Sequence, residues 1–167
     1  MASFYATSSR IGVDLQNPGS TQLFALGETV DASNDSVWVY VQASTSVTAF
    51  KMVAYNTAGA MGMASAADIV NGLQLGVAQT AFASAEYGWV PIKGSPFDLM
   101  VTGSVTAGGP AYCALSGIGT GMCAASATAS LTLNGIAILT SEGSAATSTT
   151  VCQVVLSYPK VKTPLSV

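Results

Sequence analysis

The sequence predicts an all-β fold, a compact β-barrel or sandwich with two similar halves. Two observations support this prediction. Most apolar runs are short or alternate with a period of two residues, and Gly, Ser or Asn residues bound them. These runs recur about every 8 to 12 residues, a spacing typical of all-β sandwiches and barrels.

The clearest predicted strand is 37–41, where β-branched and aromatic residues follow one another as Val-Trp-Val-Tyr-Val. The other predicted strands are 50–55, 87–92, 99–101, 131–133, 136–139 and 151–156. Residues 64–70 and 124–129 are candidates for helical turns, although neither carries an apolar stripe of helical period.

The two ends of the chain differ from its middle. Residues 1–26 contain a turn signal at 17–20 (Asn-Pro-Gly-Ser) and then a lone apolar run at 23–26, and we expect an extended N-terminal arm that lies on another surface. Residues 27–159 form the predicted β-rich domain. Residues 160–167 form the predicted C-terminal tail, near which two prolines restrict strand pairing. Disordered termini are the alternative for both ends.

A weak internal repeat divides the predicted domain. Residues 46–49 recur at 104–107, residues 62–64 at 121–123, and residues 76–78 at 135–137. A one-residue insertion aligns all three pairs. Chance is the alternative, because Gly and Ala coincide easily in this composition, but a duplication predicts two β units at about 37–94 and 95–157 that share one core.

Charged residues are scarce and exclude several functions. They make up 8% of the chain, with five basic and eight acidic residues, no histidine and a net charge of −3, against about 25% in a typical soluble protein. Without histidine there is no Ser-His-Asp triad, no Cys-His pair and no His-containing metal site. Five scattered basic residues provide no patch that neutralises phosphates, so no nucleic-acid partner is expected.

The acidic residues do not predict a catalytic or metal site. Glu28, Asp31 and Asp35 lie close together, but their spacing does not match a calcium-binding loop, and a hairpin turn is the expected structure. The other acids stand alone in sequence. We therefore expect no enzyme activity and no cofactor.

Membrane association and disulfide bonding are also not expected. No apolar stretch reaches the roughly 20 residues of a spanning helix, and the N-terminus lacks the basic start and apolar middle of a signal peptide. Cys113, Cys123 and Cys152 are odd in number and lack the C-x-x-C spacing. Buried thiols are expected, with one disulfide and a leftover thiol as the alternative.

The strand at 37–41 has two apolar faces. Alternation places Val37, Val39 and Val41 on one face and Trp38 and Tyr40 on the other. Each face is too apolar to be left in water, which predicts that one packs the core and the other meets a partner. The tryptophans at 38 and 89 are therefore either core residues or interface anchors.

An ordered series of short motifs carries a family resemblance. They are residues 26–30, 37–43, 75–78, 87–90, Gly94, 105–109, 135–137 and 154–159. Over about residues 26–159 the chain resembles the small decoration (cement) proteins of tailed-bacteriophage capsids. The most telling piece is Tyr-Gly-Trp-Val at 87–90, which follows Gly-Val-Ala at 76–78.

The resemblance implies a trimeric, non-catalytic β-rich protein on the outer surface of the virion, made in the bacterial cytoplasm, that clamps neighbouring major capsid protein subunits. The candidate interface residues are Leu23, Phe24, Leu26, Trp38, Tyr40, Trp89, Tyr158, Lys160 and Lys162. One alternative is a receptor- or carbohydrate-binding module of a phage tail or fibre, with Tyr5, Tyr55 and Tyr112 as its aromatic platform. Another self-assembling structural subunit is the third possibility.

Overall fold

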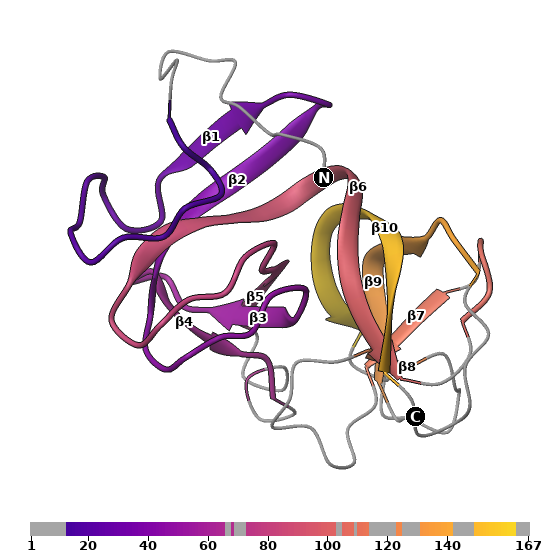
Figure 1. Ribbon diagram of the computed structural model, residues 1–167. Coiled ribbons are helices and arrows are strands. Elements are labelled where there is room, and N and C mark those ends of the chain that lie inside the picture. The colour runs from indigo at the N-terminus through magenta and orange to yellow at the C-terminus, as the bar shows by residue number, and fades with distance from the viewer. Residues whose placement is uncertain are drawn as a thin grey trace.

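The described residues form one hydrogen-bonded β-sheet of ten strands, which curls into two lobes joined by a long bent strand (Figure 1). This computed structural model describes residues 13–65, 68, 73–102, 105–108, 110–113, 123–124, 131–141 and 149–162. The all-β prediction is confirmed. Within these ranges Asp68 is the one residue in helical conformation, and no helix is long and apolar enough to cross a membrane.

The strands are β1 (Thr29–Ala32), β2 (Ser36–Ala43), β3 (Met52–Tyr55), β4 (Ala60–Met63), β5 (Gln74–Val77), β6 (Tyr87–Thr102), β7 (Pro110–Cys113), β8 (Cys123–Ala124), β9 (Leu131–Ile138) and β10 (Thr149–Lys162). The predicted strands 87–92 and 99–101 are parts of the single 16-residue strand β6. Those at 131–133 and 136–139 are likewise joined in β9. β10 extends two residues past the predicted start of the tail at residue 160.

The hairpin between β1 and β2 forms at the predicted acidic turn. Asn34 and Asp35 have φ angles of 60° and 56°, and the Ser36 N–H donates to the Ser33 carbonyl at 3.3 Å. Positive φ at both central residues is what a tight hairpin turn of type I′ requires, and Asn and Asp tolerate it well. Local sequence thus sets this turn.

Strand β6 bends in its middle and serves both lobes. Its first part pairs with β2 and its second part with β10, and Lys93 lies opposite Val37 on one side and Ser157 on the other. The next residue, Gly94, has a φ of 115°, a backbone conformation that residues with a Cβ avoid. The bend therefore depends on glycine at this position.

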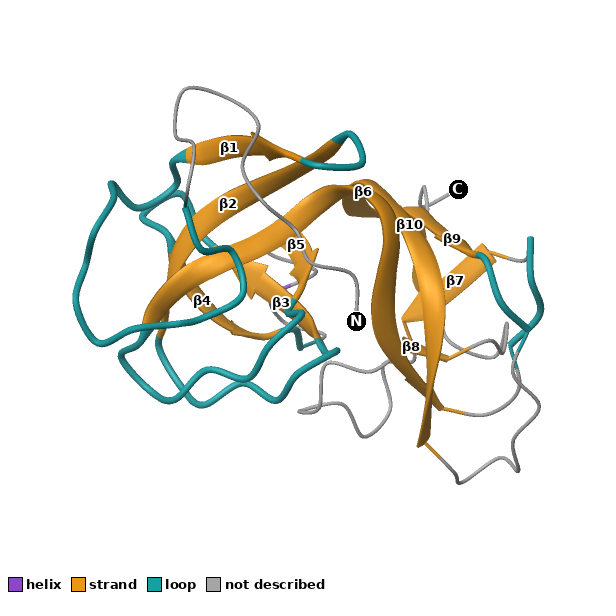
Figure 2. Cartoon of the chain, turned by 45° about the horizontal axis from the view of Figure 1, so that its top comes forward, coloured by secondary structure: helices purple, strands orange, loops and turns teal. Residues whose placement is uncertain are grey.

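The two lobes repeat one pairing pattern. In the first, β2 pairs parallel with β4, β3 pairs antiparallel with β4 and β5, and β6 pairs antiparallel with β2. In the second, β6, β7, β8, β9 and β10 take the places of β2, β3, β4, β5 and β6. An added β10–β9 pairing closes the second lobe into a ring of five strands, visible in Figure 2.

The repeated tetrapeptide occupies the same place in each lobe. Val47 and Val105 are both bridge residues just ahead of a turn. In the two turns, Phe50 and Gly108 have φ angles of 65° and 75° and donate backbone hydrogen bonds to Ala78 at 2.6 Å and Ile138 at 2.9 Å. The boundary between the lobes lies within β6, while the division into 1–26, 27–159 and 160–167 stays a prediction.

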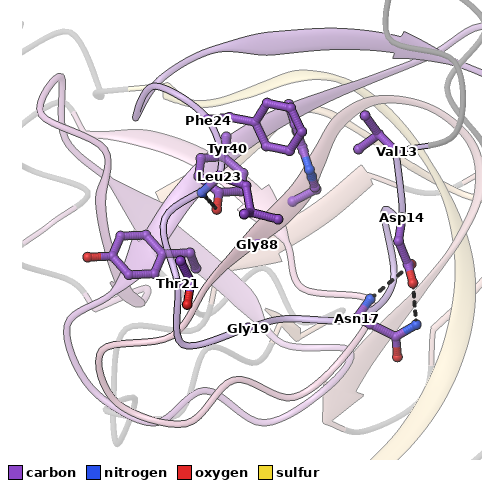
Figure 3. A pocket seen from close by; sticks show the side chains of 11 residues that line it. Val13, Asp14, Asn17, Gly19, Thr21, Leu23, Phe24, Tyr40 and Gly88 are labelled. Carbon is purple, nitrogen blue, oxygen red and sulfur yellow. Dashed lines mark hydrogen bonds between the residues drawn. The ribbon is translucent and has the colours of Figure 1, made fainter.

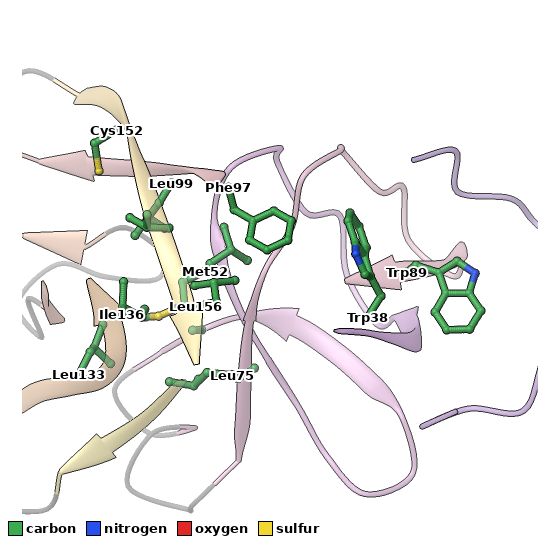
Figure 4. Close-up of a cluster of buried hydrophobic side chains, with 14 of the residues drawn as sticks. Trp38, Met52, Leu75, Trp89, Phe97, Leu99, Leu133, Ile136, Cys152 and Leu156 are labelled. Carbon is green, nitrogen blue, oxygen red and sulfur yellow. The ribbon is translucent and has the colours of Figure 1, made fainter. Parts of the chain in front are cut away.

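The buried side chains form two clusters, one on each face of β2. Figure 4 shows part of the larger cluster, in which Trp38 and Phe97 meet edge to face at 5.6 Å. In the smaller cluster Val39 and Val41 pack with Phe82. The predicted alternation is correct, but the chain itself covers both faces, which corrects the expectation that one of them meets a partner.

Cys152 is a buried thiol in β10, as expected, with 1% of its surface exposed. The side chains of Cys113 and Cys123 lie outside the described part of the structure. Of the candidate helical turns, Ser65 and Asp68 form a reciprocal cap: each side chain accepts the backbone N–H of the other, at 2.9 and 3.3 Å. The other candidate lies outside the described residues beyond Ala124.

The buried Tyr55 hydroxyl predicts a loss of stability at alkaline pH. Burial raises the pKa of Tyr55 from 10.0 to about 12. Between these pH values the unfolded chain ionises at Tyr55 while the folded chain stays neutral, so the free energy of unfolding falls as the pH rises. Urea denaturation at a series of pH values measures this fall, and a Tyr55→Phe variant should lose that component. An equal fall in the variant would contradict the prediction.

Candidate functional site

The structure divides the seven predicted interface residues whose side chains it describes between core and surface. Trp38, Tyr40 and Trp89 have exposed fractions of only 0, 2 and 3%. The alternative left open for the tryptophans is thereby decided in favour of core packing. Leu23 and Tyr158 are exposed, at 73 and 50%. The structure therefore brings the aromatic candidates together inside the first lobe and leaves these two residues to solvent.

The N-terminal segment from residue 13 packs on its own chain. Leu15 is 2% exposed within the larger core cluster, and Phe24 and Leu26 pack against that cluster. Gly19 and Tyr87 exchange two backbone hydrogen bonds of 2.9 and 2.8 Å. The expected arm does lie on a surface, but that surface is the β2–β6 part of the same chain.

A missing side chain on β6, next to the arm, makes room for the ring of Phe82. A Cβ on Gly88 would lie 2.7 Å from the Phe82 ring and 3.4 Å from the Cα of Pro18. Such contact with Phe82 would force the ring or the strand to move. The glycine of the Tyr-Gly-Trp-Val motif thus has a packing role: it leaves room for the Phe82 ring against the strand.

Four aromatic rings lie where the arm crosses the strands. The ring of Tyr40 lies 5.3 Å from Phe24, 5.0 Å from Trp89 and 6.3 Å from Tyr87, measured between centroids. Phe24 also lies 5.2 Å from Trp89. Such pairs stabilise a fold by roughly 0.5–1.5 kcal/mol each beyond the burial of their area. This cluster holds the arm in place.

A groove of about 520 Å³ runs between the arm and these strands (Figure 3). It is lined by Val13, Asp14, Asn17, Gly19, Thr21, Leu23, Phe24, Tyr40, Tyr87, Gly88 and Trp89. The Tyr40 hydroxyl accepts a hydrogen bond of 3.1 Å from the Leu23 N–H, which fixes the backbone at one rim. The groove thus combines an aromatic floor with polar and aliphatic groups at its edge.

Asp14, the charged side chain among the described residues that line the groove, is held in a defined position. The Asp14 carboxylate accepts hydrogen bonds from the Asn17 side-chain amide at 2.6 Å and from the backbone N–H groups of Gln16 at 2.9 Å and Asn17 at 3.2 Å. These bonds, led by that from the Asn17 side chain, lower the pKa of Asp14 below its usual value. The carboxylate is therefore fixed and ionised at neutral pH.

Other acidic side chains hold turns together. Glu28 accepts the Ala25 N–H at 3.3 Å, and Glu86 accepts the Ala83 N–H at 2.7 Å. Each bond spans three residues and satisfies a backbone donor that the turn would otherwise leave open. Among the described residues no group of three or more acidic, cysteine or histidine side chains is placed to hold a metal ion.

Tyr158 projects from an irregular part of β10. Its φ is 49°, and the pairing register with β9 shifts between Leu156 and Lys160. Gly135 lies against this bulge, where a Cβ would collide with the Ser157 carbonyl oxygen. Bulges of this kind redirect side chains. Lys160 and Lys162 pair with β9 beyond the bulge, and their side chains are not among those described.

Two exposed aliphatic residues were missed as interface candidates. Leu139 is 43% exposed and Val151 37% exposed, and the Leu139 N–H donates to the Gln153 carbonyl of β10 at 2.7 Å. The period-two alternation of the predicted strand 151–156 could have identified Val151 as an exposed residue. It separates Val151 from the inward-facing Cys152 and Val154.

Comparison with solved structures shows a likeness to a phage protein. The chain is similar to the N base of the head fiber protein gp8.5 of bacteriophage phi29, with 12% sequence identity and a TM-score of 0.49, over 77% of this chain and 99% of that one. No family model and no curated protein matches the sequence.

Proposed function

We propose that this chain is a non-catalytic structural protein of a phage virion, which binds the outer surface of the capsid and stabilises it by bridging major capsid protein subunits as a trimer. The motif resemblance to capsid decoration proteins is one support. Its N-terminal motifs, at 26–30, 37–43, 75–78 and 87–90, fall on β1, β2, β5 and β6 or at their ends.

The observation that carries the proposal is an uncovered apolar surface on the second lobe. This outer β9–β10 face contains Leu139, Val151 and the half-buried Val155. Met100 of β6 lies opposite Val151 in the register, and the polar pair on the same face is Gln153 opposite Asp98. The central cores of protein interfaces are likewise built mainly from apolar side chains. The face therefore fits a protein partner better than it fits bulk water.

A capsid offers many copies of the same partner surface. A trimer that touches several subunits holds each contact at a high effective concentration once the first has formed, so modest individual contacts act together. Bridging of this kind resists separation of neighbouring subunits. It requires no catalytic residue or cofactor.

Charging the outer β9–β10 face tests the proposal. The double variant Leu139→Lys, Val151→Lys is expected to bind purified undecorated capsids at least about tenfold more weakly, since each lysine would have to be buried without a partner charge. Co-sedimentation with capsids measures binding, and thermal melting checks that the fold is intact. A double variant of two exposed first-lobe residues, Thr48→Lys and Thr57→Lys, adds the same charge and should bind as the wild type does.

Full capsid binding by the double lysine variant would contradict this assignment of the surface. Failure of the wild-type protein to bind capsids at all would contradict the proposed function itself. Polymers of the isolated protein, detected by mass photometry, would favour the self-assembling subunit. Of the three tyrosines expected to form the aromatic platform of a tail module, Tyr55 is buried, with 5% of its surface exposed. Tyr5 and the side chain of Tyr112 lie outside the described residues.

A further inference from the structure

We infer that the groove between the arm and strands β2 and β6 is a binding site for a neutral saccharide. This function goes beyond capsid binding and uses the opposite lobe from the outer β9–β10 face. A pyranose ring has apolar C–H faces and a rim of hydroxyl groups. It therefore needs a site that is aromatic on one side and hydrogen-bonding at the edge.

The aromatic side of the groove is built and rigid. Tyr40 and Trp89 form its buried floor, and the half-buried Phe24 and Tyr87 retain exposed surface next to them. Tyr87 lies nearly parallel to Tyr40, at an interplanar angle of 15°. Packing fixes these rings before any ligand arrives, so little conformational entropy would be lost on binding.

The edge of the groove provides hydrogen-bonding groups. An ionised carboxylate offers about four acceptor positions, and the three bonds from Gln16 and Asn17 occupy three of those on Asp14. The remaining position suits a hydroxyl donor, and hydrogen bonds to charged acceptors are the stronger kind. Asn17 and the exposed Thr21 supply further polar groups to the lining.

The charge of the lining selects among ligands. Among the described residues that line the groove, Asp14 is the charged one, and none of the others is a lysine or an arginine. A phosphate or an acidic sugar would meet this carboxylate without a compensating cation. The site therefore favours an uncharged ligand.

The backbone of the groove does not offer a place for an added peptide strand. Gly19 and Tyr87 already satisfy each other, since each N–H donates to the other's carbonyl. Peptides that bind by strand addition need unpaired backbone groups at a sheet edge. The volume of about 520 Å³ is within the roughly 300–1,000 Å³ of small-molecule sites.

Saturation-transfer NMR on the full chain tests this inference. The probes are the methyl β-glycosides of glucose, galactose and N-acetylglucosamine, together with maltose and cellobiose. At least one probe is expected to receive saturation and to shift the amide resonances of Gly19 and Gly88. The Asp14→Asn variant is expected to weaken that binding at least about tenfold, because a charge-assisted hydrogen bond is lost.

The control for Asp14→Asn is Asp35→Asn, which removes the same charge at the β1–β2 turn, where asparagine tolerates the positive φ. It should bind as the wild type does. A second groove variant, Thr21→Ala, keeps the Asp14 hydrogen bonds and is expected to weaken binding two- to fivefold. It separates ligand contact from any loosening of the arm in Asp14→Asn.

Three outcomes would overturn the inference: no probe receives saturation at millimolar concentration, binding is the same in Asp14→Asn and Asp35→Asn, or the shifted amides lie away from the groove. Preferential binding of a short apolar peptide at Gly19 and Gly88 would also overturn it, in favour of a protein ligand. None of these outcomes bears on capsid co-sedimentation, so the two proposals fail independently.

Discussion

Replacing Trp38 with alanine is expected to lower the free energy of unfolding by about 3–5 kcal/mol, the usual cost of truncating a large buried aromatic residue. Trp38 has no exposed surface, and its ring meets Phe97 edge to face at 5.6 Å. The indole N–H donates to the Ser36 hydroxyl at 3.0 Å. Alanine would leave a cavity on one side and a buried hydroxyl that has lost a donor on the other.

Urea denaturation followed by circular dichroism measures this loss. The matched control is Leu23→Ala, which truncates a side chain that is 73% exposed and should change stability by less than about 0.5 kcal/mol. If Trp38→Ala kept wild-type stability but lost self-association, Trp38 would be an interface anchor after all. Mass photometry of the variant distinguishes these outcomes.

The sequence predicts fold class well because strand periodicity is a local signal. Residues 37–41 alternate as expected, and the structure buries both faces. What alternation cannot say is what covers each face. Val39 and Val41 are covered by Phe82, which comes some forty residues later. A surface that looks available in the sequence can therefore be buried by distant parts of the same chain.

Strand prediction from the sequence fails where pairing with neighbouring strands overrides the low strand propensity of individual residues. Pro91, Gly94 and Pro96 look like strand breakers, yet β6 runs through all three. Pro91 lies opposite Trp38 at a register shift, and Gly94 and Pro96 lie where the strand changes partners from β2 to β10. These residues bend the strand rather than end it.

Short strands escape prediction for a related reason. β4 reads Ala-Met-Gly-Met and β5 reads Gln-Leu-Gly-Val, and neither has a run of β-branched residues. They are strands because β2 and β3 supply hydrogen-bonding partners. Context of this kind commonly outweighs intrinsic strand propensity.

The groove was not predictable from local patterns either. The apolar run at 23–26 and the aromatic strands were both identified in the sequence. Their meeting depends on the backbone hydrogen bonds that Gly19 and Tyr87 exchange. No short-range pattern encodes a contact between residues so far apart in the chain.

A second large effect is expected at the bend that joins the lobes, where Gly94→Ala should destabilise the fold by about 3 kcal/mol, from backbone strain and overpacking together. The φ of Gly94 is 115°. A Cβ there would lie 2.6 Å from the Cβ and 2.7 Å from the Cα of Ser36. The neighbouring atoms belong to the backbone and first side-chain carbon of β2, so they cannot move aside cheaply.

Two other glycines separate the causes of this loss. Gly108 has a φ of 75°, and a Cβ added there would meet no atom within 4 Å, so Gly108→Ala should cost about 1 kcal/mol from conformation alone. Gly19 has open space and no positive φ, and Gly19→Ala should change stability by less than about 0.5 kcal/mol. Urea denaturation of the three variants should rank them in that order.

If Gly94→Ala cost no more than Gly108→Ala, β2 would be free to move away from β6, and the lobes would be joined by a hinge. A larger loss in a single transition would mean that the bend holds both lobes in one cooperative unit, since β6 supplies a strand to each.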